Sequence, residues 1–223
     1  MATPLLRAQG PRERMLAHGP ACLSNAELLG IVLRTGRRGC NAVQLGQTLL
    51  DHFNGLKGLL SAEASALRQM DGIGPAKCAE LLVIRELHRR CALESLTGQP
   101  LLDQAEKVRD YCLSHLGHLP VEHCLALFLD NQLRLITAEE ISRGTINQAS
   151  VYPREIVRAA LRHHSSALIL AHNHPSGAAY PSDADIRLTR HIRQALALVE
   201  VRLLDHIIVT PTQAVSMAER GDL

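Results

Sequence analysis

The second half of the chain alternates short apolar runs with amphipathic stretches. Residues 124–129 form a short apolar run, and residues 167–171 are apolar on both faces, which is typical of a strand covered on both sides. Residues 133–141 follow the turn-like segment 130–132 and are expected to form a return strand, and residues 201–209 another. This pattern predicts a central sheet.

Helical spacing separates these strands. The segment 108–116 has one apolar face, and Pro153 suits the first position of a helix over 153–161. A third apolar stripe runs from Leu188 to Val199. We therefore expect a mixed α+β fold in which helices flank the sheet.

The first part of the chain has helical spacing only. Ser24 and Glu27 have the spacing of a capping box, and helices are expected at 42–53 and 76–91. No strand-like alternation occurs over residues 1–95. This part is predicted to be an all-helical unit.

A linker is expected at 95–104, which contains Gly98 and Pro100 and lacks periodicity. The sequence thus predicts two domains, a helical unit over 1–95 and an α+β unit over 102–223.

Composition narrows the class of protein. Hydrophobic residues make up 46% and charged residues 21%, as in soluble globular proteins, while aromatic residues at 2% argue against binding single strands by base stacking. No apolar run reaches the roughly 18 residues of a membrane span, and residues 1–14 lack the apolar core of a signal peptide. We expect a cytoplasmic protein with no membrane partner. The sequence leaves its oligomeric state open.

The candidate chemistry lies just after the second fully apolar strand. His172 and His174 are two residues apart and so share one face of a strand. A Pro- and Gly-containing loop over 175–181 then leads to a helix whose first turn holds Asp185. Two imidazoles and one carboxylate are the ligands of a hydrolytic zinc site with an open position for water. The same set also suits other divalent ions.

Each of these residues also has a purely structural interpretation. The histidines could satisfy hydrogen bonds at the end of a strand, and Ser182 and Asp185 have the spacing of a capping box. Four polar residues that follow a buried strand are harder to explain by packing, so together they favour a metal site.

The segment resembles a known family. Its pattern H-x-H-x7-S-x2-D matches the signature of the JAMM (MPN-plus) metallopeptidases without a gap. The HNHPSG sequence at 172–177, together with YPRE at 152–155, DHII at 205–208 and residues 19–29, is similar to bacterial RadC proteins. The resemblance covers nearly the whole chain.

The resemblance implies a role for each matching residue. His172, His174 and Asp185 would hold one zinc ion per chain, and Ser182 would hydrogen-bond the oxyanion or the substrate carbonyl. The implied reaction is hydrolysis of a peptide or isopeptide bond in a protein or peptide substrate.

The signature also requires an upstream glutamate as general base. In JAMM proteins this residue precedes an apolar strand, and Glu122 stands directly before the apolar run 123–128. Glu139, Glu140 and Glu155 are the alternatives, although Glu155 is also explained by the dipole of its helix.

A second motif lies in the helical unit. Residues 67–79 resemble a helix–hairpin–helix, in which Gly72 and Gly74 form a tight turn that presents backbone N–H groups to phosphate. Lys77 could add a charge, and the unit has 12 basic residues against 8 acidic ones. The alternative is a plain helical corner in which Ile73 fills the core.

Two functions of different classes follow. The first is a zinc-dependent metallopeptidase with an accessory helical unit, and the second is a DNA-associated repair accessory protein whose metal domain binds without cleaving. Deaminases and HExxH proteases are excluded, because the chain has neither a C-x-x-C pair nor that motif. His206 is interpreted as a structural hydrogen-bonding residue, with contact to a metal ligand as the alternative.

Overall fold

The structure, a computed structural model, describes residues 9–144 and 151–223. Within these residues the chain forms two compact units that divide between His88 and Arg89. No described helix is long and apolar enough to cross a membrane.

The regular elements described in the first unit are helices, as predicted, and Arg37 and Cys40 form an isolated antiparallel bridge. The helices of this unit are α1 (Pro11–His18), a short 3-10 helix (Pro20–Cys22), α2 (Asn25–Leu33), α3 (Ala42–His52), α4 (Leu56–Ser61), α5 (Ala64–Gln69) and α6 (Pro75–Glu94), the last of which continues into the second unit. The capping box at Ser24 is confirmed, since Glu27 N–H donates to its hydroxyl at 3.3 Å and its own N–H donates to Glu27 Oε2 at 2.9 Å. Leucines dominate the core of this unit.

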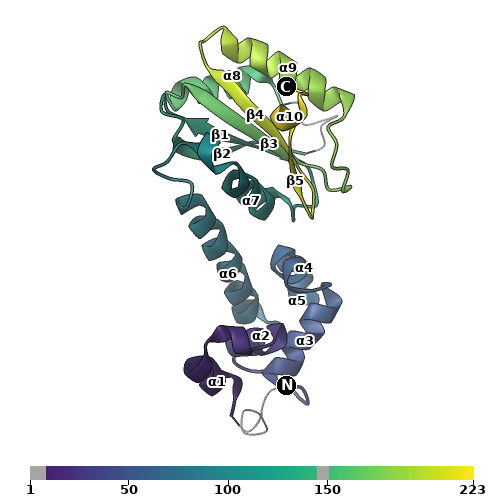
Figure 1. The fold of residues 1–223 in the computed structure, drawn as a ribbon. Coiled ribbons are helices and arrows are strands. Elements are labelled where there is room, and N and C mark those ends of the chain that lie inside the picture. Colours follow the sequence, from purple (N-terminus) through teal and green to yellow (C-terminus); the bar gives the residue numbers. More distant parts are fainter. Residues whose placement is uncertain (1–8, 145–150) are drawn as a thin grey trace. The chain divides into compact units, whose positions relative to one another are not determined.

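The second unit is built around a mixed sheet of five described strands (Figure 1). The strands are β1 (His123–Leu129), β2 (Leu135–Arg143), β3 (Ala167–Asn173), β4 (Arg202–Val209) and β5 (Ala214–Ser216), in the order β2-β1-β3-β4-β5. β3 and β4 are parallel, and the other neighbouring pairs are antiparallel.

Helices cover both faces of the sheet. α7 (Ala105–Leu116) packs on one face, and α8 (Pro153–Arg162) and α9 (Asp183–Ala197) pack on the other. Alternate residues of β1 divide between the two cores, because successive side chains of a strand point to opposite faces. Leu125 and Leu127 join the core with α7, whereas Ala126 and Phe128 join the core with α8 and α9.

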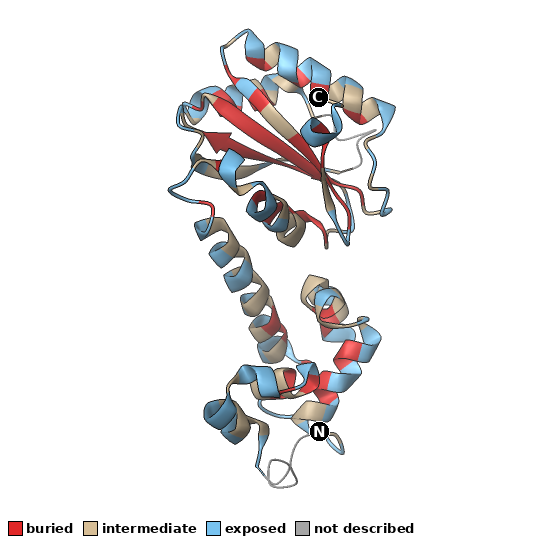
Figure 2. Ribbon diagram, in the orientation of Figure 1, coloured by how far each residue is buried: buried red, intermediate tan, exposed pale blue. Residues whose placement is uncertain are grey.

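Burial follows this arrangement. Every residue of β1 and β3 is buried, and Figure 2 shows both strands as continuous buried ribbons. The expected α+β class, a helical region followed by a sheet flanked by helices, is confirmed.

The segment predicted as a linker contributes to the second unit. Leu96 and Leu101 are 0% and 1% exposed and belong to the core beside α7, and Leu101–Gln104 forms a 3-10 helix. Two further short elements, β5 and α10 (Met217–Arg220), lie near the end of the described chain and were not predicted.

Candidate metal centre

The end of β3 carries the two histidines. His172 pairs in register with Cys124 of β1 and Ile208 of β4. His174 follows the strand, and its N–H donates to the Val209 carbonyl at 2.7 Å, which continues the β3–β4 ladder. Strand alternation therefore places the two imidazoles on the same side, as predicted.

Asn173, between them, points the other way and fixes the neighbouring loop. Its Oδ1 accepts the His123 N–H at 2.7 Å. Its Nδ2 donates to the carbonyls of Leu119 and Val121 at 3.2 and 3.0 Å. Glu122 therefore sits in a stretch of backbone that is tied to the end of β3.

The start of α9 supplies the carboxylate. Ser182 is the N-cap, and its hydroxyl accepts the Asp185 N–H at 3.2 Å and donates to Asp185 Oδ2 at 2.6 Å. The Ser182 N–H donates to the same oxygen at 2.7 Å. This capping box holds the carboxyl of Asp185 inward, where the residue is 0% exposed.

The two imidazoles and the carboxylate converge. His172 Nε2 lies 2.9 Å from His174 Nε2 and 3.3 Å from Asp185 Oδ1, and His174 Nε2 lies 3.4 Å from Asp185 Oδ2. Within the described chain, these three residues form the cluster of histidine and carboxylate ligands with the spacing of a metal site.

The cluster has lone pairs that protein hydrogens do not satisfy. Asp185 Oδ1 is buried and accepts no hydrogen bond from the described residues. His174 Nδ1 lies 2.7 Å from the Ala178 carbonyl, which only accepts, so its hydrogen is on Nδ1 and the Nε2 lone pair faces the cluster. His172 Nε2 lies 2.9 Å from this nitrogen, so a proton or a cation is required between the two.

Zinc distances agree with this spacing. With Zn–N and Zn–O bonds of about 2.0–2.1 Å, neighbouring ligand atoms of a tetrahedral site lie about 3.3 Å apart. His172 Nε2 and Asp185 Oδ1 are separated by this distance, His174 Nε2 lies 3.4 Å from the other carboxylate oxygen, and the two Nε2 atoms are slightly closer together. The residues therefore fit a divalent cation.

The electrostatics of the cluster also favour a cation. The adjacent carboxylate of Asp185 is the main cause that raises the pKa of His174, against the effect of burial. Burial acts to raise the pKa of Asp185, but its contacts with the imidazoles of His172 and His174 outweigh it and leave that pKa below its usual range. Asp185 is therefore an ionised carboxylate in a buried position.

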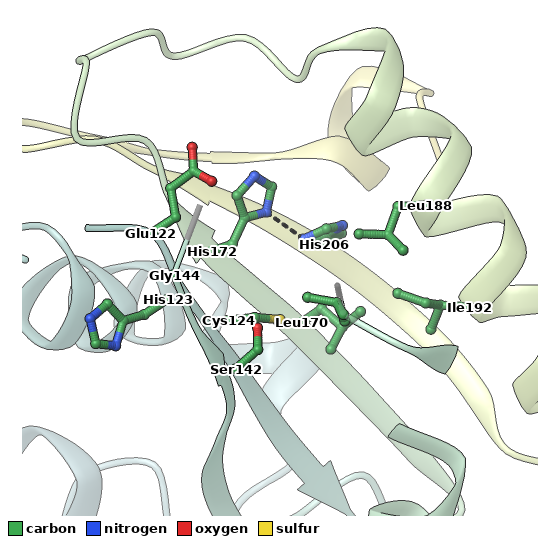
Figure 3. A pocket seen from close by; sticks show the side chains of 11 residues that line it. Glu122, His123, Cys124, Ser142, Gly144, Leu170, His172, Leu188, Ile192 and His206 are labelled. Carbon is green, nitrogen blue, oxygen red and sulfur yellow. Dashed lines mark hydrogen bonds between the residues drawn. The ribbon is translucent and has the colours of Figure 1, made fainter. Parts of the chain in front are cut away.

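Two buried residues lie behind His172. His206 of β4 is 1% exposed, and its Nε2 lies 2.7 Å from His172 Nδ1 (Figure 3). Its Nδ1 lies 2.6 Å from the hydroxyl of Thr189, which is 0% exposed. Burial, followed by the charge of His172, holds the pKa of His206 well below its usual range. The structure thus places His206 in contact with a candidate ligand, which was the alternative interpretation of this residue in the sequence.

Thr189 was missed in the sequence. It occupies the core-facing stripe of α9 that also contains Asp185, Ile192 and Leu196. The signal that could have identified Thr189 is a polar residue on the core-facing stripe, one helical turn after Asp185 and before the apolar residues of that stripe.

Glu122 lies beside His172. It lines the same pocket as His172 and His206, and Figure 3 shows its carboxylate near the His172 ring. Its charge also contributes to the raised pKa of His174, after the larger effects of Asp185 and of the Ala178 carbonyl.

The alternative glutamates are engaged elsewhere. Glu139 contacts Arg162 at 2.6 Å, and Glu140 lies 3.0 Å from His123 Nδ1. Glu155 forms an ion pair one turn along α8. Among the four glutamates, Glu122 alone lines the pocket that His172 and His206 share.

The glycine turn of the first unit joins α5 to α6. Gly72 has a φ of +89°, in the left-handed region, and Gly74 precedes Pro75 with open space beside its Cα. Lys77 is not turned outward, because its ammonium donates to the carbonyls of Gly36 and Gly72 at 2.9 and 3.0 Å. In this structure Lys77 stabilises the turn itself.

Comparisons with known proteins identify the family. The RadC-like JAB domain matches residues 102–222, and the UPF0758 N-terminal region matches residues 4–79. A UPF0758 protein of Bordetella bronchiseptica is 57% identical over 220 residues, which cover 99% of this chain and 98% of the relative.

Relatives from other genera agree. UPF0758 proteins of a Polaromonas species and of Variovorax paradoxus are 55% and 50% identical over 211 and 212 residues, each covering 95% of this chain and 94% of the relative. The domain match and the near full-length similarity together show that the chain belongs to the RadC family, with a RadC-like JAB domain preceded by a UPF0758 N-terminal region.

Proposed function

We propose that this protein is a zinc-dependent metallopeptidase of the JAMM type that hydrolyses a peptide or isopeptide bond. The observation that carries the proposal is the convergence of two imidazole nitrogens and a buried carboxylate, one oxygen of which accepts no hydrogen bond from the described chain. The end of a strand needs only hydrogen-bond partners for its backbone. Two imidazoles and a buried carboxylate in contact there, with the carboxylate of Glu122 nearby, therefore support a metal site.

Each residue has a distinct part in this mechanism. His172, His174 and Asp185 would hold the ion. When bound, Zn²⁺ supplies Lewis acidity toward a water molecule and a substrate carbonyl. Glu122 accepts the proton of the attacking water and returns it to the leaving amine, the work of a general base and then of a general acid.

Ser182 has a structural part and a proposed catalytic one. Its hydroxyl donates to Asp185 Oδ2 and so orients a proposed ligand. To donate to the substrate carbonyl, as the family signature implies, the hydroxyl must turn away from Asp185, while the Ser182 N–H still holds that oxygen.

Removal of the metal provides the direct test. The full-length protein is expected to cleave members of a panel of peptides and isopeptides, to lose this activity with a zinc chelator, and to regain it when Zn²⁺ is added. Protein that carries zinc but cleaves no member of the panel would contradict the peptidase proposal and support the accessory role.

DNA binding by the first unit is a second candidate function. It is favoured by the turn at Gly72 and Gly74, which leads directly into the N-terminus of α6, where free backbone N–H groups can bind phosphate. The engagement of Lys77 reduces the number of charged contacts, so the binding would be weak.

Salt dependence tests this second function. Affinity for duplex DNA is expected to fall with rising salt with a small slope, about −0.9 per phosphate contact. Gly74→Glu, which adds an anion in open space, should abolish binding, whereas Ser65→Glu on the exposed surface of α5 should change it little. Binding that ignores salt, or that survives Gly74→Glu, would exclude this surface.

A further inference from the structure

A chain of buried polar groups runs behind the proposed ligand His172. Thr189, His206 and His172 are 0%, 1% and 4% exposed. Their contacts are short, with 2.6 Å between Thr189 Oγ1 and His206 Nδ1 and 2.7 Å between His206 Nε2 and His172 Nδ1, the contact dashed in Figure 3.

The direction of these hydrogen bonds follows from the hydroxyl of Thr189. This oxygen lies 2.6 Å from the carbonyl oxygen of Asp185, one turn earlier in α9. Two oxygens at that distance need a hydrogen between them, and because a carbonyl only accepts, Thr189 must donate its single hydrogen there. The Met217 sulfur, 3.9 Å away, is a much weaker acceptor.

Thr189 can then only accept from His206. His206 Nδ1 therefore carries the hydrogen, and because burial disfavours the charged form, the ring is neutral and its Nε2 has a lone pair. That lone pair accepts from His172 Nδ1, so the neutral form of the His172 ring, which is the form that binds a metal ion, has no hydrogen on Nε2. This is the nitrogen that faces His174 and Asp185.

We propose that Thr189 and His206 are positioning residues that fix the tautomer of His172, so that its Nε2 lone pair is available to a metal ion. The proposal rests on the metal site of the proposed function. It also distinguishes the two histidines, because His174 is oriented directly by the Ala178 carbonyl, whereas His172 depends on a side-chain relay that starts at the turn of α9 holding Asp185.

Thr189→Val tests the relay, with Thr189→Ser as its matched control. Valine keeps the shape of threonine but can neither donate nor accept. A buried N–H without an acceptor is disfavoured, so His206 is expected to move its hydrogen to Nε2 and His172 to move its own to the metal-facing Nε2. Serine keeps the hydroxyl and should leave both rings unchanged.

Two measurements report the result. Nitrogen-15 NMR of the metal-free protein at alkaline pH, where imidazoles are neutral, should show the Nδ1–H tautomer of His172 in wild type and Thr189→Ser, and its loss in Thr189→Val. Competition with a chromogenic chelator should show zinc affinity about 10–100-fold weaker in Thr189→Val than in Thr189→Ser.

The outcomes separate this relay from the proposed function. A Thr189→Val protein that keeps the Nδ1–H tautomer and wild-type zinc affinity would overturn the relay. Wild-type protein with the expected tautomer but no affinity for zinc would support the hydrogen-bond direction and refute the metallopeptidase.

A second pair of variants applies if Thr189→Val does not fold. His206→Gln can donate to Thr189 and accept from His172, so it should keep most of the zinc affinity. His206→Leu can do neither and should lose it, and equal affinities in the two variants would overturn the relay.

Discussion

Replacing Asp185 by asparagine is expected to remove zinc from the protein. The variant should purify with almost no zinc, whereas wild type should carry about one ion per chain. Loss of a residue that merely orients a ligand costs about 10–100-fold in metal affinity. Loss of a ligand that also carries the neutralising charge should cost more.

The physical reason is charge, since asparagine is nearly the same size as aspartate. Asp185 is completely buried and ionised, and within the described cluster it is the negative partner of two imidazoles. An amide at this position can still accept the N–H of Ser182, so the start of α9 should remain intact. It cannot balance a divalent cation in a site with little water.

Asp183→Asn is the matched control for this experiment. Asp183 lies in the same first turn of α9 but is exposed. Elemental analysis and zinc titration of both variants, with circular dichroism to verify folding, should show zinc lost only in Asp185→Asn. Full zinc occupancy in Asp185→Asn would mean that the metal is held elsewhere.

The sequence predicts the positions of the proposed ligands because their spacing is local. His172 and His174 share a strand face by the alternation of β structure, and the strand itself is recognisable from its apolar run. Asp185 is drawn inward by a capping box with Ser182 that the spacing also indicates. Local structure within residues 172–185 therefore determines most of the arrangement of these three side chains.

Contacts between distant segments are not predictable in the same way. Lys77 looks like a phosphate ligand in the sequence, but the carbonyl of Gly36, 41 residues earlier, accepts from its ammonium. Leu101 lies in an aperiodic segment, yet its N–H donates to the Leu133 carbonyl and its side chain is buried beside α7. Such pairings depend on how the elements pack, which a local pattern does not encode.

The proposed general base could be placed only with the sheet register, for the same reason. Glu122 has no fixed spacing from the histidines, so the sequence leaves four glutamates open. β1 pairs with β3 so that Cys124 lies opposite His172, and this register brings the residue before β1 to the site. The register of β2 instead places Glu140 opposite Leu125, further along β1.

Glu122→Gln is expected to abolish hydrolysis while zinc remains bound. General acid–base catalysis contributes about 10²–10⁴-fold to a rate, so the rate constant for cleavage of a peptide substrate should fall by about that factor. Glutamine keeps the size of the side chain but cannot accept the proton of the attacking water. Zinc content should be unchanged, because Glu122 is outside the set of proposed ligands.

Glu140→Gln is the matched control. It shows whether the loss of any negative charge near the site lowers the rate, or only the loss of the Glu122 carboxylate. Glu140 is the rival on the adjacent strand, and it pairs with His123 rather than lining the pocket with His172. Kinetics of both variants on the same substrate, with zinc measured in each sample, should show a large loss only for Glu122→Gln. If Glu140→Gln is the inactive variant, Glu140 on β2 is the general base, and the assignment of that role to Glu122 is wrong. If both variants cleave at the wild-type rate, neither carboxylate moves the proton, and the reaction proposed for this site loses its base.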